Sequence, residues 1–124
     1  MVKKIKLSNK LIFCFDIDNT ICKTNGASYK KSYPIKKNIQ SINNLYKKGH
    51  YIKIFTSRYM GRTNSNIKKA KKLGYEKTLK QLKSWGLNFN KFIMGKPRFD
   101  VYVDDKNLGY KKNWADQINK KYKI

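Results

Sequence analysis

The sequence predicts an α/β fold in which a parallel β-sheet is flanked by helices. Apolar runs of strand length recur along the chain, and segments with helical spacing of apolar residues lie between them. No internal repeat or Pro/Gly-rich linker divides the 124 residues. Strands that alternate with helices form parallel sheets with helices on both faces. We therefore expect a single domain that spans residues 1–124.

Four apolar runs are expected to form the strands. They are residues 11–15 (LIFCF), 51–55 (YIKIF), 91–95 (KFIMG) and 100–104 (DVYVD). Ligands of a parallel sheet bind beyond the carboxyl ends of its strands. The residues that follow each run are therefore the first candidates for a functional role.

Helices are expected between these strands. Pro34 suits a first helical turn, and apolar side chains then recur at helical spacing until Gly49. Two further helical patterns cover about residues 64–73 and 75–85, and Gly86 is a natural terminator of the second. A short last helix is expected over residues 113–121. Residues 22–33 (CKTNGASYKKSY) are left as a flap close to the end of the first strand.

The chain is strongly basic, with 30 Lys and Arg against 7 Asp and Glu and a net charge of +23. Such a charge attracts polyanions. However, 27 of the 30 are lysines scattered along the chain, whereas arginine is preferred for phosphate and base recognition. We therefore favour a small anionic substrate over nucleic acid as the partner. No run approaches the roughly 18 apolar residues of a membrane span, and the first ten residues do not resemble a signal peptide, so we expect a cytoplasmic protein without a membrane partner.

Four of the seven acidic residues fall at predicted strand ends. Asp16 and Asp18 follow the first strand, and Asp104 and Asp105 end the fourth. Carboxylates that lie together repel one another unless a cation offsets their charge. Oxygen ligands on strand ends suit Mg²⁺, which commonly bridges to a substrate phosphate. We therefore expect Mg²⁺ as the cofactor.

The other two strands end in a hydroxyl pair and in basic residues. Thr56, Ser57 and Arg58 follow the second strand, and Lys96 follows the third. A lysine and a threonine can contact phosphoryl oxygens by charge and by hydrogen bond. An aspartate can attack phosphorus as a covalent nucleophile. Together with the acids, these residues indicate phosphoryl transfer.

The strings that carry these residues resemble the four motifs of the haloacid dehalogenase-like (HAD) phosphatases. FDIDNTI resembles the first motif, IKIFTSR the second, GKP the third and VYVDDK the fourth, in the order of the family. The resemblance implies a Rossmann-like, HAD-like domain. It implies no large cap domain, because only 40 positions separate Asp16 from Thr56, and 40 separate Thr56 from Lys96. The runs TSRYMGRTN and TLKQLKSWGLNFNKFIMGKP are also similar to small phosphatases of capsule and surface-polysaccharide biosynthesis.

The resemblance also implies catalytic roles for the motif residues. Asp16 would be the nucleophile that forms an aspartyl-phosphate. Asp18 would be the general acid for the leaving alkoxide and then the base that activates water. Thr56 and Lys96 would hold the phosphoryl oxygens.

The metal and the rest of the substrate are assigned on the same resemblance. Mg²⁺ would be bound by Asp16, the backbone carbonyl of Asp18 and Asp104, with Asp105 ligating directly or through water. Alternatively, Asp105 could cap a helix. The residues expected to contact the substrate beyond the phosphoryl group are Arg58, Tyr59, Arg62 and, in the flap, Asn25. Ser57 is expected to bind the substrate or its phosphate.

The leading prediction is a phosphatase of a small phosphomonoester such as a sugar, polyol or amino-alcohol phosphate. A metal-dependent nuclease or a nucleic-acid end phosphatase is the alternative, because clustered acids in a basic protein fit either. A receiver-type signalling domain also uses an aspartyl-phosphate, but its paired acids precede the phosphorylated one. Without a cap the site is open, so the flap, the substrate or a second copy of the chain would have to exclude water.

Three further residues are expected to lie outside the chemistry. His50 precedes its strand, which places it at the opposite end of the sheet from the site. Cys14 is expected in the core. Cys22 lies near the site, but no base is evident beside it, and the two cysteines show neither a zinc spacing nor a disulfide framework.

Overall fold

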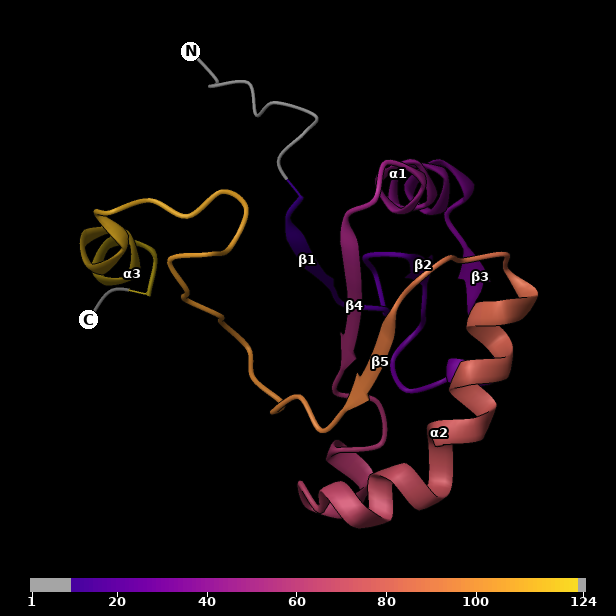
Figure 1. The fold of residues 1–124 in the computed structure, drawn as a ribbon. Coiled ribbons are helices and arrows are strands. Elements are labelled where there is room, and N and C mark those ends of the chain that lie inside the picture. The colour runs from indigo at the N-terminus through magenta and orange to yellow at the C-terminus, as the bar shows by residue number, and fades with distance from the viewer. Residues whose placement is uncertain (1–9, 123–124) are drawn as a thin grey trace.

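The computed structural model describes residues 10–122. The expectation that the first ten residues are not a signal peptide concerns a segment that, except for Lys10, lies outside the described residues. Its centre is a parallel sheet of β1 (Ile12–Phe15), β4 (Tyr51–Thr56) and β5 (Lys91–Met94), in the order β1-β4-β5 (Figure 1). The register places Phe15 beside Ile54 and Thr56 beside Met94. The α/β class and the first three predicted strands are confirmed.

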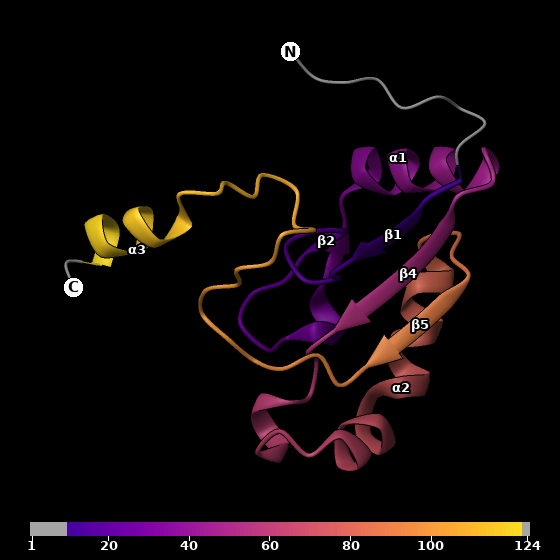
Figure 2. The same ribbon diagram turned by 60° about the vertical axis from the view of Figure 1, so that its left-hand side comes forward.

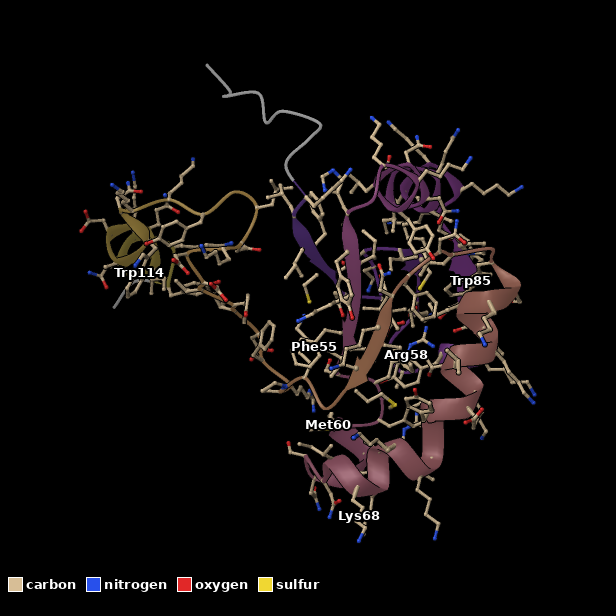
Figure 3. All side chains as sticks on the ribbon, in the orientation of Figure 1. Phe55, Arg58, Met60, Lys68, Trp85 and Trp114 are labelled. Atoms are coloured by element: carbon tan, nitrogen blue, oxygen red, sulfur yellow. The ribbon has the colours of Figure 1, made fainter. Side chains whose placement is uncertain are left out.

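The alternation of β4 separates the two faces of the sheet. Ile52, Ile54 and Thr56 are buried, whereas Tyr51 is exposed and Phe55 is half-buried. Successive side chains of a strand point to opposite faces, so the three buried residues define the core face. Phe55 points to the other face (Figure 3).

The two long helices, α1 (Lys36–Lys47) and α2 (Ile67–Ser84), both cover this core face. Ile42 of α1 and Leu82 of α2 belong to the same hydrophobic core as Ile54. The expectation of helices on both faces is therefore wrong for this pair (Figures 1 and 2). The sheet grows in one direction from β1 to β4 to β5, and right-handed crossovers in one direction place their helices on one side.

Helix α2 is continuous where the sequence indicates two helical segments. Asn66 caps its start by accepting a hydrogen bond from the Lys69 N–H at 3.0 Å. Gly74 lies inside the helix, and a Cβ added there would come within 2.0 Å of the Tyr59 ring. Gly74 thus serves the close approach of an aromatic ring and does not break the helix. Gly86, with φ +74°, follows the end of the helix as expected.

The flap forms a short hairpin of β2 (Cys22–Lys23) and β3 (Tyr33–Pro34), with a 3₁₀ turn at Tyr29–Lys31. Pro34 therefore ends the flap, and α1 begins two residues later than its helix-start pattern indicates. A second 3₁₀ turn covers Gly61–Thr63 before α2.

The fourth predicted strand is wrong, because residues 100–104 have no strand pairing in the structure. The Tyr102 hydroxyl and the Lys106 N–H both donate to the Asp104 carboxylate, at 2.8 and 2.9 Å, which holds this segment in a local turn. The outer edge of β1 is consequently unpaired among the described residues, and Cys14 is exposed instead of lying in the core.

The chain after β5 leads to α3 (Trp114–Tyr122), which matches the expected last helix. Figures 1 and 2 show α3 apart from the sheet, on the side away from α2. Within residues 10–122, no helix combines the length and the apolar character that crossing a membrane requires.

Candidate active site

The carboxyl ends of the three strands bring together Asp16, Thr56 and Lys96. Asp16 follows the last residue of β1, Thr56 ends β4, and Lys96 follows β5 by two residues. The Lys96 Nζ lies 3.8 Å from Oδ1 of Asp16. The backbone N–H of Lys96 donates to the carbonyl of Thr56 at 3.1 Å. The Lys96 ammonium thus lies beside the Asp16 carboxylate, and the backbone of Lys96 lies beside the end of β4.

Burial dominates the electrostatics of Asp16. Desolvation raises the pKa of this carboxyl above its usual range, and the Lys96 ammonium and the Ile17 N–H oppose the rise. The Asp16 side chain is 34% exposed and opens, with Lys96, into a hollow of about 900 Å³ beside β1. The charge of the Asp16 carboxylate is thus only partly stabilised by its neighbours, and the side chain lines a hollow that can admit a ligand.

Thr56 is fully buried, and its Oγ1 accepts the backbone N–H of Arg58 at 3.1 Å. This bond uses the oxygen of Thr56 as an acceptor, so its hydroxyl hydrogen is left for another acceptor. Ser57, next along the chain, has its carbonyl in a turn that accepts the Met60 N–H at 3.0 Å.

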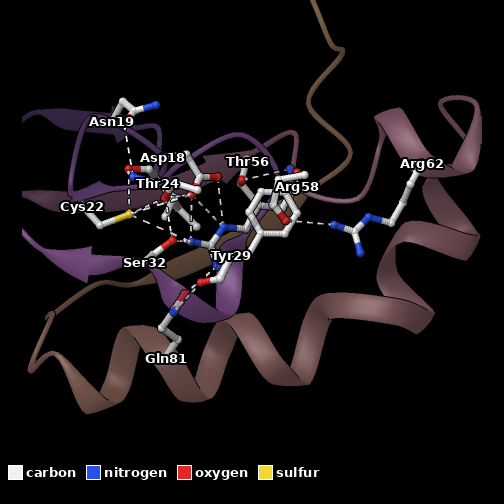
Figure 4. Close-up of polar contacts among 12 residues, drawn as sticks. Asp18, Asn19, Cys22, Thr24, Tyr29, Ser32, Thr56, Arg58, Arg62 and Gln81 are labelled. Atoms are coloured by element: carbon white, nitrogen blue, oxygen red, sulfur yellow. Dashed lines mark hydrogen bonds and ion pairs between the residues drawn. The ribbon is translucent and has the colours of Figure 1, made fainter.

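Asp18 faces a different group, the guanidinium of Arg58 (Figure 4). Arg58 Nε lies 3.1 and 3.0 Å from the two carboxylate oxygens, and Nη2 lies 2.8 Å from Oδ1. Thr24 of the flap donates its hydroxyl to the same Oδ1 at 2.6 Å. A guanidinium that contacts both oxygens of a carboxylate fixes its orientation. Asp18 is thus aimed at Arg58 in this structure.

Arg58 was expected to contact the substrate, but it is only 2% exposed. Its Nη1 donates to Oε1 of Gln81 on α2 at 2.6 Å, and its guanidinium carbon lies 4.8 Å from the centre of the Tyr29 ring. Gln81 in turn donates from Nε2 to the Tyr29 carbonyl at 2.8 Å. The structure therefore places Arg58 inside the protein, between Asp18, the flap and α2.

Sequence reasoning missed Thr24, Tyr29, Ser32 and Gln81. One signal could have identified Gln81: it lies three residues after Thr78 and directly before Leu82, both of which are buried, so a polar side chain is on the core-facing side of α2. The flap residues carry no such pattern, because they lie in a short irregular segment.

Three other residues were expected to contact the substrate. Tyr59 is buried in the hydrophobic core, whereas Arg62 and Asn25 lie on the flap side of the site. Arg62 is exposed, lies over the Tyr29 and Tyr59 rings at 5.3 and 4.7 Å, and donates to the Ala27 carbonyl at 3.0 Å. Asn25 is exposed in the flap, and its carbonyl accepts a hydrogen bond in a turn. Arg62 is thus already engaged in holding the flap.

The expected gathering of four acids at one edge is not found. Asp104 lines the same hollow as Asp16, but residues 10–122 contain no group of three or more His, Cys, Asp or Glu side chains close enough to share a metal ion. Asp105 is exposed. The reason is that residues 100–104 do not pair with β1. The Lys106 N–H and the Tyr102 hydroxyl instead hold the pKa of Asp104 below its usual value.

The donor set therefore does not fit a complete Mg²⁺ site as it is arranged. Carboxylate and carbonyl oxygens are the correct chemistry for this ion. However, Asp16 faces Lys96, Asp18 faces Arg58, and Asp104 is held in its own turn. A cation at this edge would compete with Lys96 for Asp16, and with the Tyr102 hydroxyl and the Lys106 N–H for Asp104.

His50 and Cys22 lie where the sequence indicates. His50 is buried before β4, and its Nδ1 accepts the Leu11 N–H at 3.0 Å, which is a structural role. Cys22 is fully buried, with its Sγ 3.8 Å from Oδ1 of Asp18 and 3.3 Å from Oγ1 of Thr24.

A comparison with known protein families agrees with the first two of the four motifs. The model of a family described as haloacid dehalogenase-like hydrolase matches residues 13–89, which is more than half of the chain. A search of curated proteins finds no match. The chain is similar in structure to a crystallised target protein from Vibrio cholerae, with a TM-score of 0.73 and 20% sequence identity over 90% of this chain and 98% of that one. The family match includes Asp16, Asp18, Thr56 and Arg58, and the chain belongs to the haloacid dehalogenase-like hydrolases.

Proposed function

We propose that this hydrolase is a phosphatase that cleaves small phosphomonoesters through an aspartyl-phosphate on Asp16. The observation that carries the proposal is the ion pair of Asp16 and Lys96, 3.8 Å apart beside the buried Thr56 and open to a hollow of about 900 Å³. A partly desolvated carboxylate next to an ammonium group suits attack on a phosphoryl group whose oxygens the ammonium and a hydroxyl can hold.

The proposed reaction has two steps, with the roles that the motif resemblance implies. An oxygen of Asp16 attacks phosphorus while the bond to the ester oxygen breaks, and Asp18 supplies the proton that the leaving alkoxide takes. A water molecule then attacks the aspartyl-phosphate, and Asp18 accepts its proton while Asp16 leaves as a carboxylate. Lys96 and Thr56 hold the phosphoryl oxygens in both steps. Because Asp18 faces Arg58 in this structure, it must turn before it can act.

Mg²⁺ is part of the proposal on the strength of the motif resemblance and of the oxygen donors around the hollow. When bound, this ion would neutralise phosphoryl charge. The donors would be Asp16, the backbone carbonyl of Asp18 and Asp104, with Asp105 next to it. As they lie, these groups do not form a complete site, so the steps above are derived without the ion.

The substrate class in this proposal is a sugar, polyol or amino-alcohol phosphate used in capsule or surface-polysaccharide synthesis in the cytoplasm. The similarity of TSRYMGRTN and TLKQLKSWGLNFNKFIMGKP to phosphatases of that process supports it. The hollow beside Asp16 and Lys96 is open to solvent and suits a small ester. A second copy of the chain remains our candidate for covering it.

Phosphate release from a panel of such esters, with and without Mg²⁺, tests the function. We expect release by the wild type, loss of at least 100-fold in Asp16→Asn, in line with the roughly 10²-fold or larger effects of catalytic groups, and wild-type rates in the matched control Asp100→Asn. Release that persists in Asp16→Asn would contradict the proposed nucleophile. Cleavage of DNA or RNA without release from any small ester would replace this function with a nuclease.

A further inference from the structure

Arg58 lies at the centre of a buried network that joins the first motif to the flap and to α2. Three of its hydrogen bonds, at 2.8 to 3.1 Å, go to the Asp18 carboxylate, and one goes to Gln81 at 2.6 Å. Its Nη2 also lies 3.5 Å from Oγ of Ser32. Because all three guanidinium nitrogens already have protein partners, Arg58 is not placed to bind a substrate phosphate.

The flap contacts the same two residues from its own side. Thr24 donates to Asp18 at 2.6 Å and is 2.6 Å from Ser32, and the Tyr29 ring covers the guanidinium at 4.8 Å. Moving the flap would therefore break bonds to both Asp18 and Arg58. The orientation of the acid and the position of the flap are tied together by direct contacts (Figure 4).

Gln81 contributes the link to the rigid part of the fold. It comes from α2, accepts from Arg58 through Oε1 and donates to the Tyr29 carbonyl through Nε2, so one side-chain amide holds both the guanidinium and the flap. A long helix packed against the sheet keeps this amide in place. Gln81 thus fixes the position of the Arg58 guanidinium relative to the flap.

We propose that Arg58 and Gln81 are positioning residues that couple the flap (residues 22–33) to the orientation of Asp18, so that displacement of the flap by a bound substrate releases Asp18 toward the leaving group. This inference rests on the proposed function for the role of Asp18. In this proposal Arg58 orients Asp18 and does not bind the substrate phosphate. The phosphoryl group remains with Asp16, Thr56 and Lys96.

The coupling predicts a specific kinetic pattern for Gln81→Met, which keeps the length of the side chain but removes both hydrogen bonds. We expect kcat for glycerol 2-phosphate to fall about tenfold, because an Arg58 that Gln81 no longer anchors can follow Asp18 and stay paired with it when the flap moves. This fall is a fraction of the roughly 10²–10⁴ that a positioned acid or base contributes. With p-nitrophenyl phosphate, whose leaving group needs no proton, the fall in kcat should be smaller. KM and the inhibition constant of inorganic phosphate should stay within about twofold. Arg58→Lys keeps the positive charge but loses the planar guanidinium that bonds Asp18 and Gln81 at once. It should show the same pattern more strongly.

A second readout does not depend on activity. Trypsin cleavage after Lys30 and Lys31 reports how often the flap leaves its place, and we expect it to be several-fold faster in Gln81→Met than in the wild type. Gln40→Met, at an exposed position of α1, is the matched control and should change neither cleavage nor kcat.

The possible results separate the two proposals. Equal flap cleavage in Gln81→Met and wild type would overturn the coupling, whatever the activity. A phosphate inhibition constant that rises as strongly in Arg58→Lys as kcat falls would also overturn it, because Arg58 would then be a phosphate ligand. If the wild type hydrolyses no ester, the proposed function fails, and the cleavage rates decide by themselves whether Gln81 holds the flap.

Discussion

The ammonium group of Lys96 lies 3.8 Å from Oδ1 of Asp16, although β1 and β5, the strands that lead to these residues, are separated by β4. The lysine therefore reaches across the end of the central strand. The ion pair does not offset the burial of the acid, because desolvation still raises the pKa of Asp16. The site thus keeps a carboxylate that is less stable in the folded protein than in water.

Because burial destabilises the ionised Asp16 carboxylate, we predict that Asp16→Asn is more stable than the wild type at pH 7 and equally stable at pH 3. Between the unfolded pKa, 3.8, and the raised folded pKa, the folded state binds more protons than the unfolded state, so stability falls as the pH rises through this window. Asn removes the ionisation. We expect a gain below about 1 kcal/mol, because the side chain is a third exposed and water screens it.

Thermal unfolding of Asp16→Asn and wild type at the two pH values measures this difference. Asp100→Asn, an exposed acid outside the site, should shift neither melting temperature. A variant that is less stable than the wild type at pH 7 would show that the bond to Lys96 outweighs desolvation.

The pair of Asp18 and Arg58 has the opposite effect on stability. Removing the acid in Asp18→Asn leaves a guanidinium that is 2% exposed without its ionic partner, and breaking a buried ion pair in this way costs roughly 3–5 kcal/mol. Because Asp18 itself is 21% exposed, we expect a loss of about 3 kcal/mol, near the lower limit. Urea unfolding measures it.

A double-mutant cycle with Arg58→Met supplies the control. Replacing both partners removes the uncompensated charge, so the double variant should lose less than the sum of the two single losses. Strict additivity would mean that the two side chains do not interact in solution.

Much of the site could be predicted because it follows from strand ends. The alternation in YIKIFT fixes which residues of β4 face the core, and a parallel sheet places the residues after β1, β4 and β5 at one edge. Asp16, Thr56 and Lys96 meet for this reason, although 40 positions separate each from the next.

Two features could not be predicted because they depend on tertiary context. Arg58 follows a strand end, where sequence suggests an exposed loop, and its burial requires Gln81 and Tyr29 from distant parts of the chain. The alternating run Asp100–Asp104 suits a strand, but a pattern cannot show whether the neighbouring edge of β1 is occupied. Here the Asp104 side chain accepts bonds from its own segment instead.

Gly74 gives a prediction whose sign departs from the usual rule. In a helix interior, Gly→Ala normally stabilises by about 1 kcal/mol. At Gly74 a Cβ would lie 2.0 Å from Cε2 of Tyr59, a buried ring whose backbone is already in the left-handed region with φ +68°. We therefore expect Gly74→Ala to destabilise the protein by about 1–3 kcal/mol, the cost of overpacking.

Urea unfolding in two backgrounds tests the stated cause. In Tyr59→Ala the ring is gone, and Gly74→Ala should become neutral or stabilising. If the substitution is equally harmful in that background, the clash with Tyr59 is not its reason.

Because no strand among residues 10–122 pairs with the outer edge of β1, Cys14 can report metal binding. Cys14 is exposed and lines the hollow with Asp16 and Asp104, whereas Cys22 is fully buried. A thiol reagent should therefore modify one cysteine of the native protein, and the Cys14→Ser variant none. Although the residue is exposed, partial desolvation of its sulfur raises the pKa of the Cys14 thiol, so the reaction should be slower than that of a free cysteine at the same pH.

Mg²⁺ should slow the modification of Cys14. An ion shared by Asp16 and Asp104 would draw the segment around Tyr102, which lines the same hollow, toward β1 and over the thiol. The Asp104→Asn variant should lose this protection, while Asp100→Asn should keep it. Equal rates with and without Mg²⁺ in the wild type would contradict a shared ion. A Cys14 that is unreactive before metal is added would instead show that residues 100–104 already cover β1 in solution.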